Sequence, residues 1–342
     1  MKIVVLAGGY SPERDVSLCS GSLIANALIE NGHQVLLADL YLGIPEEDYE
    51  DLYFTKASGK RYHYEIPETE PDLKKLKEES GNGAALIGPR IIEACQKADL
   101  AFLALHGAIG ENGMLQAVFD THGIHYTGTG YEGCLLAMNK DISKKLMVAA
   151  NINTAPWKTY SLQTLDLSQF ADVSYPCVVK PLSCGSSVGV SLLDNEQELL
   201  EALKSAMVYE TNVLIEKKIT GREFSVGILN DTALPSIEII PKKGFYDYKN
   251  KYQSGYTTEI CPAQISETLE LRLREAALNV HHALHLGFYS RVDFLVDEDN
   301  TLWCLEANTL PGMTPISLLP QEAKAAGISY NELCERIARA AV

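Results

Sequence analysis

Hydrophobic and polar positions along the first forty residues predict a strand, a helix and a second strand. The apolar run Ile3 to Ala7 predicts a buried strand over residues 2–7, and Gly8-Gly9 follows it as a turn. The next segment carries apolar side chains at helical spacing: Val16, Cys19, Leu23, Ala27 and Leu28. Asn31-Gly32 ends this helix, and residues 34–40 predict the next strand. This order indicates a βαβ unit with a parallel sheet.

The following residues first interrupt this rhythm and then resume it. Residues 43–90 are rich in Glu, Lys, Pro, Gly and Asn, which predicts an inserted surface segment. Residues 100–105 form another apolar strand pattern, and residues 114–122 form a helical one. The first domain is expected to end near Tyr131.

The second half of the chain shows shorter apolar runs separated by turns. A helix is expected over residues 138–150. Strands are expected near 177–180, 188–193, 213–217, 223–230, 234–240, 288–296 and 301–307, and helices near 195–208, 266–286 and 330–340. We therefore expect a parallel α/β domain followed by antiparallel α+β material.

Composition and charge exclude several classes of protein. The 342 residues include 29 Lys and Arg against 45 Asp and Glu, a net charge of −16, which disfavours a protein that coats nucleic acid or an anionic membrane. No apolar stretch reaches the roughly 18 residues of a spanning helix, and the N-terminus lacks the apolar core of a signal peptide. Eight scattered cysteines without a C-x-x-C pair indicate reduced thiols and a cytoplasmic location.

Two loops are candidates for ligand binding. The first, AGGYSPERD, joins a strand to a helix but lacks the third glycine of a dinucleotide fingerprint. It places Glu13 where an anion would approach, so it suits a cationic group or simply complements the helix dipole. The second runs from Lys180 to Gly189 and is rich in Gly and Ser. Its backbone N–H groups and hydroxyls suit a phosphate, although a plain hairpin turn shows the same pattern.

The strongest cluster lies in the strands near 288–296 and 301–307. A turn at Asp297 to Asn300 predicts a hairpin that pairs Val296 with Thr301. In that register Arg291 lies opposite Glu306, and Asp293 lies opposite Cys304. The period of two places four polar side chains on one face: Arg291, Asp293, Glu306 and Asn308.

This polar face predicts a metal site. Two carboxylates and an amide oxygen are hard ligands of the kind that Mg²⁺ prefers. A surface salt bridge between Arg291 and Glu306 is the simpler alternative, but Val292 and Phe294 mark these strands as part of a core. Placing charges beside such strands is costly unless a metal or an anion is bound, so we favour the metal.

The chain carries, in this order, the stretches GGYSPERDVSLCSG, ALHGAIGENGMLQ, YTGTG, MNKDISKKLM, PCVVKPLSCGSSVGV, VLIEKKITGREFSV, FYDYKNKY, SRVDF and LEANTLPGMTPISLLP. Together and in this order, these motifs resemble those of the D-alanine–D-alanine ligases of the ATP-grasp superfamily. The likeness covers essentially the whole chain except residues 43–90. Asn112 and Cys184 depart from the residues usual in that family, and we expect them to tune the site without abolishing it.

The resemblance implies an ATP-grasp fold preceded by a parallel α/β domain. The implied parts are an N-terminal substrate domain over 1–131, a central subdomain over 132–220 and a C-terminal subdomain over 221–342. The last carries the metal site and a lid over 244–256. The resemblance also implies a homodimer that forms through the N-terminal domain.

Site residues carried over from the resemblance fall into three groups. ATP would contact Lys140, Lys180, Ser186, Ser187, Glu216, Lys217, Ile219, Glu223 and Lys251. Two Mg²⁺ ions, or Mn²⁺ in their place, would bind Asp293, Glu306 and Asn308. The amino-acid substrates would meet Glu13, His106, Ser186, Tyr252, Arg291, Gly312 and Ser317, among which Glu13, Ser186, Tyr252 and Arg291 would serve catalysis.

The implied reaction joins two D-alanine molecules at the expense of ATP, through a D-alanyl phosphate, and supplies a peptidoglycan precursor. Tyr252 favours an amine as the second nucleophile, because the lactate-using relatives differ in this lid motif. The alternatives are a D-alanine–D-lactate or D-alanine–D-serine ligase, another carboxylate–amine ligase, or a nucleotide-binding regulatory protein without turnover. The complete set of acidic and basic site residues disfavours the regulatory protein.

Overall fold

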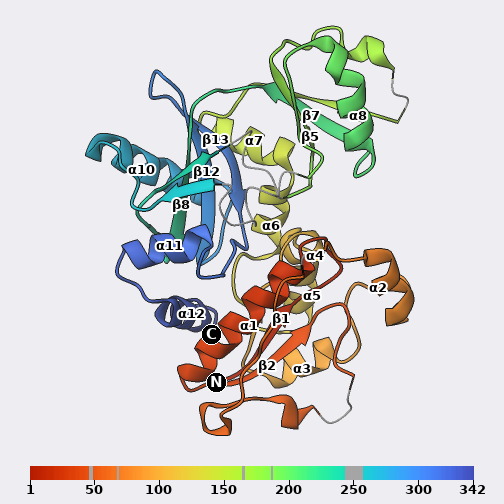
Figure 1. Ribbon diagram of the computed structural model, residues 1–342, viewed down its shortest axis with the longest axis vertical. Coiled ribbons are helices and arrows are strands. Elements are labelled where there is room, and N and C mark those ends of the chain that lie inside the picture. The colour runs from red at the N-terminus through yellow and green to blue at the C-terminus, as the bar shows by residue number, and fades with distance from the viewer. Residues whose placement is uncertain (46–48, 68, 164–165, 186–187, 243–256) are drawn as a thin grey trace.

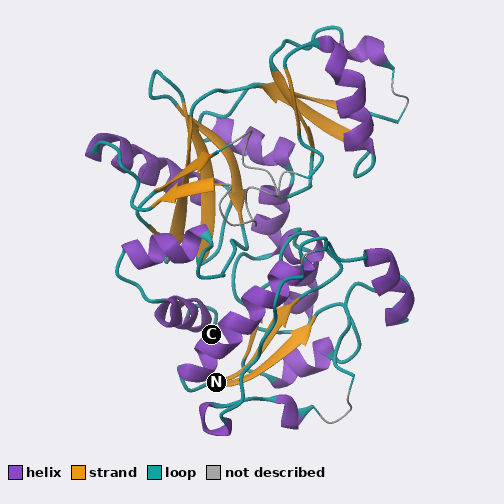
Figure 2. Cartoon of the chain, viewed as in Figure 1, coloured by secondary structure: helices purple, strands orange, loops and turns teal. Residues whose placement is uncertain are grey.

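Three β-sheets organise the chain into three lobes (Figures 1 and 2). The computed structural model describes residues 1–45, 49–67, 69–163, 166–185, 188–242 and 257–342. None of the helices in these ranges is long and apolar enough to span a bilayer.

The N-terminal lobe contains a parallel sheet in the order β2-β1-β3, which confirms the predicted βαβ unit. Its strands are β1 (Lys2–Ala7), β2 (Gln34–Asp39) and β3 (Leu100–Leu103), and its helices are α1 (Arg14–Glu30), α3 (Ile91–Lys97), α4 (Ala108–Glu111) and α5 (Met114–Thr121). Apolar residues 3–7 are completely buried in β1, which explains why this strand forms the centre of the sheet. The C-terminal helix α12 (Tyr330–Arg339) also packs on this lobe, beside α1.

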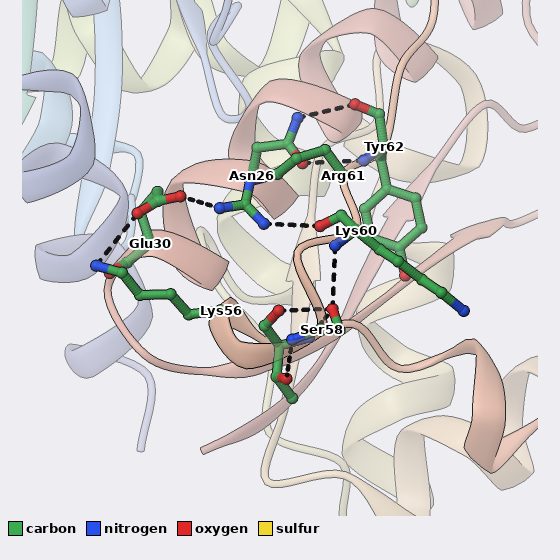
Figure 3. A network of polar contacts seen from close by, with 8 residues as sticks. Asn26, Glu30, Lys56, Ser58, Lys60, Arg61 and Tyr62 are labelled. Carbon is green, nitrogen blue, oxygen red and sulfur yellow. Dashed lines mark hydrogen bonds and ion pairs between the residues drawn. The ribbon is translucent and has the colours of Figure 1, made fainter.

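Residues 43–90 are mostly exposed but are attached firmly to the lobe. They contain the short helices η1 (Glu50–Leu52), η2 (Lys56–Ser58) and α2 (Leu73–Ser80), and they bury Ile44 and Tyr49 in the core. Figure 3 shows how they attach to α1: the Asn26 amide donates to the Tyr62 carbonyl, and the Tyr62 N–H donates back to Asn26, at 2.8 and 3.0 Å. The Tyr62 hydroxyl proton is shared between the carbonyls of Val35 in β2 and Leu52 in η1. This polar clamp fixes the segment against the βαβ unit.

The central lobe contains an antiparallel sheet in the order β4-β7-β5-β6. Its strands are β4 (Trp157–Ser161), β5 (Cys177–Pro181), β6 (Ser191–Leu193) and β7 (Asn212–Lys217). The helices η3 (Leu167–Phe170), η4 (Glu196–Glu198) and α8 (Leu199–Met207) belong to this lobe. Helices α6 (Tyr131–Met138) and α7 (Lys140–Ala149) precede it in the chain, and their Ala137 and Met147 are buried in the core of the third lobe. The helix expected over residues 138–150 begins only at Lys140, because the Asn139 side chain accepts the N–H groups of Asp141 and Ile142 and caps it.

The third lobe contains the sheet β11-β10-β8-β12-β13, with β9 (Thr232–Ala233) paired to β8. Its long strands are β8 (Arg222–Leu229), β10 (Ile237–Pro241), β11 (Thr257–Ile260), β12 (Tyr289–Val296) and β13 (Leu302–Asn308). Helix α10 (Glu267–Ala283) packs on one face against Phe224, Val226 and Val292, while α11 (Leu318–Ala325) lies beside β8. Helix α11 covers the opposite face of β8 at Gly227, and the rest of that face, including Asp293 and Glu306, faces a cavity.

The register predicted for the β12–β13 hairpin is wrong. The turn shifts the pairing by one residue, and a bulge shifts it by one more. Val296 pairs with Leu302 rather than Thr301, because the Asp297 carboxylate accepts the N–H groups of Asp299 and Thr301 and widens the turn. Leu305 is then an extra residue in β13, so Asp293 lies opposite Glu306 and not opposite Cys304. Arg291 lies opposite Asn308 and not opposite Glu306. The four polar residues nevertheless share one face, as predicted.

Candidate active site between two antiparallel sheets

A cavity of about 500 Å³ lies between the central and C-terminal sheets. Polar side chains reach it from both sheets and from α7: Lys140, Lys180, Glu216, Lys217, Glu223, Glu238, Asp293 and Glu306. Apolar side chains cover the rest, including Val178, Leu192, Ile219, Ile239 and Leu295. A cavity lined by apolar side chains together with several lysines suits a ligand with an apolar part and an anionic part.

Lys140 enters the cavity from the first turn of α7. Its ammonium donates to the Cys184 carbonyl at 2.5 Å and so contacts the glycine-rich loop. Burial lowers the pKa of Lys140, and the Glu306 carboxylate opposes that effect. Leu182 and Ser183, at the start of the same loop, donate their N–H groups to the Glu210 carboxylate at 2.9 Å each. Lys140 and Glu210 thus hold this loop from two sides.

Lys180 and Glu216 form an ion pair in the wall of the cavity. Glu216 is 6% exposed, and its second oxygen accepts a hydrogen bond from the buried Lys144 at 2.7 Å. Burial alone would raise the pKa of Glu216, but Lys180 and Lys144 outweigh it and lower that pKa. Conversely, burial would lower the pKa of Lys180, and the Glu216 carboxylate reverses this and raises it. Glu216 is therefore an anion held between two cations.

The other predicted nucleotide residues divide into two groups. Lys217, Ile219 and Glu223 line the same cavity as Lys140 and Lys180, so the structure brings these predicted residues together. Ser186, Ser187, Lys251 and Tyr252 lie outside the described residues, as does the predicted lid over 244–256. Their contributions stay predictions.

The predicted metal face carries oxygen ligands that suit Mg²⁺, but the Asp293 carboxylate is hydrogen-bonded to other side chains of the protein. The Asp293 carboxylate accepts hydrogen bonds from Ser225 at 2.6 Å, from Asn308 at 3.0 Å and from Nε and Nη2 along one edge of the Arg291 guanidinium at 3.0 and 2.9 Å. Within the described part of the chain, no group of three or more His, Cys, Asp or Glu side chains is placed to hold a metal. The protein itself thus offers two carboxylates and one amide, so an ion bound here would need further oxygens from water or a phosphate-bearing ligand.

A second cluster lies where the N-terminal lobe meets this face. Glu13 is 9% exposed, and a Cβ atom on Gly107 would lie 2.7 Å from its carboxylate, so the site requires glycine there. Burial lowers the pKa of His106 below its ordinary value. The nearby Glu13 carboxylate opposes this effect, and the Arg291 guanidinium adds to it. The His106 Nε2 atom is buried and has no hydrogen-bond partner among the described residues. The structure thus brings the predicted Glu13, His106 and Arg291 together.

Gly312 and Ser317 lie together at the start of α11. A Cβ atom on Gly312 would approach the Ser317 hydroxyl to 2.8 Å, and that hydroxyl also contacts Thr314 at 2.8 Å. Their predicted role in holding the second amino acid stays a prediction.

Two site residues were missed in the sequence. Glu111, at the end of α4, lines a small adjoining cavity of about 30 Å³ with Lys140, Glu306 and Asn308. Burial, together with Glu13 and Glu306, raises its pKa to about 8. Lys144 is the other. Its spacing of four residues from Lys140 on a helix would have placed both on one face.

Asn112, the unusual residue beside Glu111, accepts the Met114 N–H and serves the turn between two helices.

Two antiparallel sheets that face one cavity lined by lysines and acidic residues define an ATP-grasp protein. The family models described as D-ala D-ala ligase N-terminus and D-ala D-ala ligase C-terminus match residues 2–129 and 146–339. The chain therefore belongs to the D-alanine–D-alanine ligase family.

Full-length relatives and solved structures agree with this membership. The D-alanine–D-alanine ligase of Pediococcus pentosaceus is 46% identical, with 98% of this chain and 96% of that protein covered. The corresponding ligase of Lacticaseibacillus casei is 41% identical, with 97% and 93% covered. The Bacillus anthracis D-alanine–D-alanine ligase in complex with ATP superposes with a TM-score of 0.75 at 29% identity, covering 100% of this chain and 97% of that one. The VanG D-Ala:D-Ser ligase from Enterococcus faecalis superposes with a TM-score of 0.77 at 28% identity, covering 100% and 99%.

Proposed function

We propose that this protein joins two D-alanine molecules into D-alanyl-D-alanine, with ATP as co-substrate, and thereby supplies a precursor of peptidoglycan. One observation carries this proposal: Lys140 and Lys180 line the same cavity as Asp293 and Glu306. Glu13, His106 and Arg291 lie at the neighbouring lobe boundary. Phosphate-binding cations, acidic groups and a carboxylate suited to an ammonium group are the parts that this ligation needs.

The nucleotide occupies the large cavity in this proposal. Val178, Ile219 and Ile239 provide apolar surface for the base, and Lys140 and Lys180 neutralise the phosphates. The carboxylate of the first D-alanine attacks the γ-phosphate, and ADP leaves as an acyl phosphate forms. Glu13 holds the ammonium of this D-alanine. Because the acyl phosphate is prone to hydrolysis, the lobes must exclude water around it.

Asp293, Glu306 and Asn308 would hold Mg²⁺, or Mn²⁺, together with the phosphate oxygens. A bound ion supplies charge neutralisation for phosphoryl transfer. The Arg291 guanidinium pairs with the Asp293 carboxylate and also lies near His106, so Arg291 connects the acidic end of the site with its amino-acid end.

The second D-alanine approaches with a neutral amine, which attacks the acyl carbon as phosphate leaves. Arg291 stabilises the oxyanion of the tetrahedral intermediate, and loss of one such donor typically lowers the rate by about 10²–10³-fold. Gly312 and Ser317 hold this substrate. Ser186 and Tyr252 complete the site, with Ser187 and Lys251 on the phosphates.

The test is phosphate release from Mg-ATP with D-alanine, L-alanine, D-lactate plus D-alanine, or D-serine plus D-alanine, with products identified by mass. We expect D-alanyl-D-alanine from D-alanine alone. Glu306→Gln removes one acidic metal ligand while keeping the shape of the side chain, and we expect turnover to fall by about 10²-fold or more. Glu298→Gln, on an exposed turn of the same hairpin, should leave turnover unchanged.

One second candidate function is retained because of a specific likeness. The VanG D-Ala:D-Ser ligase superposes on the whole chain, so D-serine is a competing second substrate. A mixed product formed in preference to D-alanyl-D-alanine would assign the protein to the serine- or lactate-using ligases. No phosphate release with any pair, despite nucleotide binding, would contradict the catalytic proposal and favour a regulatory protein.

We also propose a cytoplasmic location and a homodimer. All eight cysteines are free thiols, which supports a reducing compartment. Light scattering on the purified protein tests the dimer, because a monomer would have a mass of 37.5 kDa.

A further inference from the structure

Lys144 is a buried cation behind the wall of the nucleotide cavity. It is 2% exposed and lies on α7, one turn after Lys140. Its ammonium donates to the Thr154 hydroxyl at 2.6 Å and to Glu216 at 2.7 Å. The ammonium also lies 5.1 Å from the centre of the Trp157 ring, and Trp157 pairs with Glu216 across β4 and β7. Lys144 itself is not among the described residues that line the cavity.

The Glu216 carboxylate is shared between two lysines with different surroundings. One oxygen faces Lys144, behind the wall, and the other faces Lys180, in the cavity. Lys180 is the cation that the nucleotide phosphates require. A carboxylate that had only Lys180 as a partner would hold that lysine tightly, since an unpaired buried anion is very costly.

We propose that Lys144 is a positioning residue: it keeps Glu216 paired from behind, so that Lys180 is free to turn to the phosphates of the nucleotide. The inference rests on the proposed ATP site and adds a residue to it. Within the group formed by Lys144, Glu216 and Lys180, two positive charges and one negative charge leave one net positive charge. Without Lys144 that charge disappears, and Glu216 and Lys180 neutralise each other.

The proposal predicts a loss confined to phosphate recognition. Binding of the non-hydrolysable analogue AMP-PNP with Mg²⁺, and of adenosine, is measured by titration calorimetry on the full-length protein. Lys144→Met should weaken AMP-PNP binding by about tenfold or more, as expected for loss of one charged contact. Adenosine, which has no phosphate, should bind within about twofold of wild type. Lys145→Met is the matched control, because Lys145 is the exposed neighbour on α7 and pairs with Asp141.

A second background keeps the test decisive if Lys144→Met folds poorly. In Glu216→Gln there is no carboxylate to capture Lys180. Adding Lys144→Met to that variant should then change AMP-PNP affinity by less than about threefold, although it costs tenfold in the wild-type background. Thermal unfolding identifies variants that do not fold.

Specific outcomes would overturn the inference. Equal losses for adenosine and AMP-PNP would mean that Lys144 only supports the shape of the cavity. The same loss in the wild-type and Glu216→Gln backgrounds would mean that Lys144 does not act through Glu216. An unchanged affinity in Lys144→Met would remove any role in binding. If the wild-type protein failed to bind AMP-PNP at all, the proposed function itself would fall, which is a separate result.

Discussion

Glu322 is a carboxylic acid that the fold buries completely near the amino-acid end of the site. One oxygen accepts the Gly227 N–H at 3.0 Å, and the other has no hydrogen-bond partner among the described residues. A Cβ atom on Gly227 would lie 2.6 Å from that second oxygen, so glycine makes the room for it. Burial raises the pKa of Glu322 well above its usual range, although Arg291, the strand neighbour of Gly227, acts in the opposite direction. The folded protein therefore keeps this group protonated to a higher pH than the unfolded chain does.

The sign of the pH effect on stability follows from this raised pKa. In the unfolded chain Glu322 ionises near its ordinary pKa of 4.5, while in the folded protein it stays protonated to higher pH. The unfolded state therefore gains stability as the pH rises between these two values. Glu322→Gln keeps an oxygen for the Gly227 N–H but does not titrate. We expect the difference in unfolding free energy, variant minus wild type, to rise by at most about 1.4 kcal/mol for each pH unit in this window.

Urea unfolding of both proteins at pH 5 and pH 8 measures this difference. All other titrating groups are common to the two proteins, so the change in the difference belongs to residue 322. The exposed Glu298→Gln provides the control and should follow wild type at both pH values. Parallel stability curves for Glu322→Gln and wild type would show that Glu322 titrates normally.

At the scale of the elements, the β12–β13 hairpin shows what the sequence predicts and what it leaves out. Both strands and their shared polar face follow from residue alternation, because Val292 and Phe294 must be buried. The bulge at Leu305 does not follow, because it depends on a turn widened by Asp297 and on the core that receives Cys304. Without the bulge, Cys304 and Glu306 would share one face. With it, Cys304 is buried and Glu306 reaches the cavity.

The segment over residues 43–90 illustrates the same limit. Its polar composition predicts exposure, which holds for most of it, but says nothing of where it attaches. Attachment depends on single side chains such as Tyr62, whose ring stacks on Phe54 with centroids 4.5 Å apart. Lys144 and Glu111 were missed for a related reason: their roles come from groups that are distant in sequence, which only the fold brings together.

Tyr62→Phe tests how firmly this clamp holds. The hydroxyl proton is shared between the carbonyls of Val35 and Leu52 at 2.9 Å each, and burial raises the pKa of Tyr62 to about 12. Phenylalanine keeps the stacking and leaves these acceptors without the donor, so we expect a loss of about 1–2 kcal/mol in unfolding free energy. Arg61→Ala is the control, because the Arg61–Glu30 pair shown in Figure 3 is exposed and should contribute less than about 1 kcal/mol. Equal losses in the two variants would contradict a buried clamp at Tyr62.

At the scale of the whole molecule, the C-terminal helix α12 packs on the N-terminal lobe. Helix α12 comes after the β12–β13 hairpin, yet its residues Leu333, Cys334 and Ile337 are buried in the same core as β1 and α1. The His33 side chain contacts the N-terminal amine at 3.2 Å and Glu335 at 2.7 Å, and the Asn31 amide donates to the Asn331 carbonyl. The predicted bounds of the subdomain over residues 221–342 stay a prediction; what the structure shows is that α12 packs on the N-terminal lobe. The lobe that carries Glu13 and His106 is thus completed by the end of the chain.

Ile337→Ala tests whether α12 stabilises the N-terminal lobe in particular. Ile337 is 1% exposed, and truncating a buried isoleucine to alanine costs about 2–5 kcal/mol. Hydrogen–deuterium exchange followed by mass spectrometry should show faster exchange across residues 2–39, because opening of that lobe requires less free energy. Peptides from β5 and β7, in the central lobe, should keep their wild-type protection because they share no core with α12. Arg336→Ala, which removes only an exposed pair with Glu332, should change unfolding by no more than about 0.5 kcal/mol. If exchange rose only within α12, the helix would be a passive attachment, and if it rose equally in all lobes, the three would unfold as one unit.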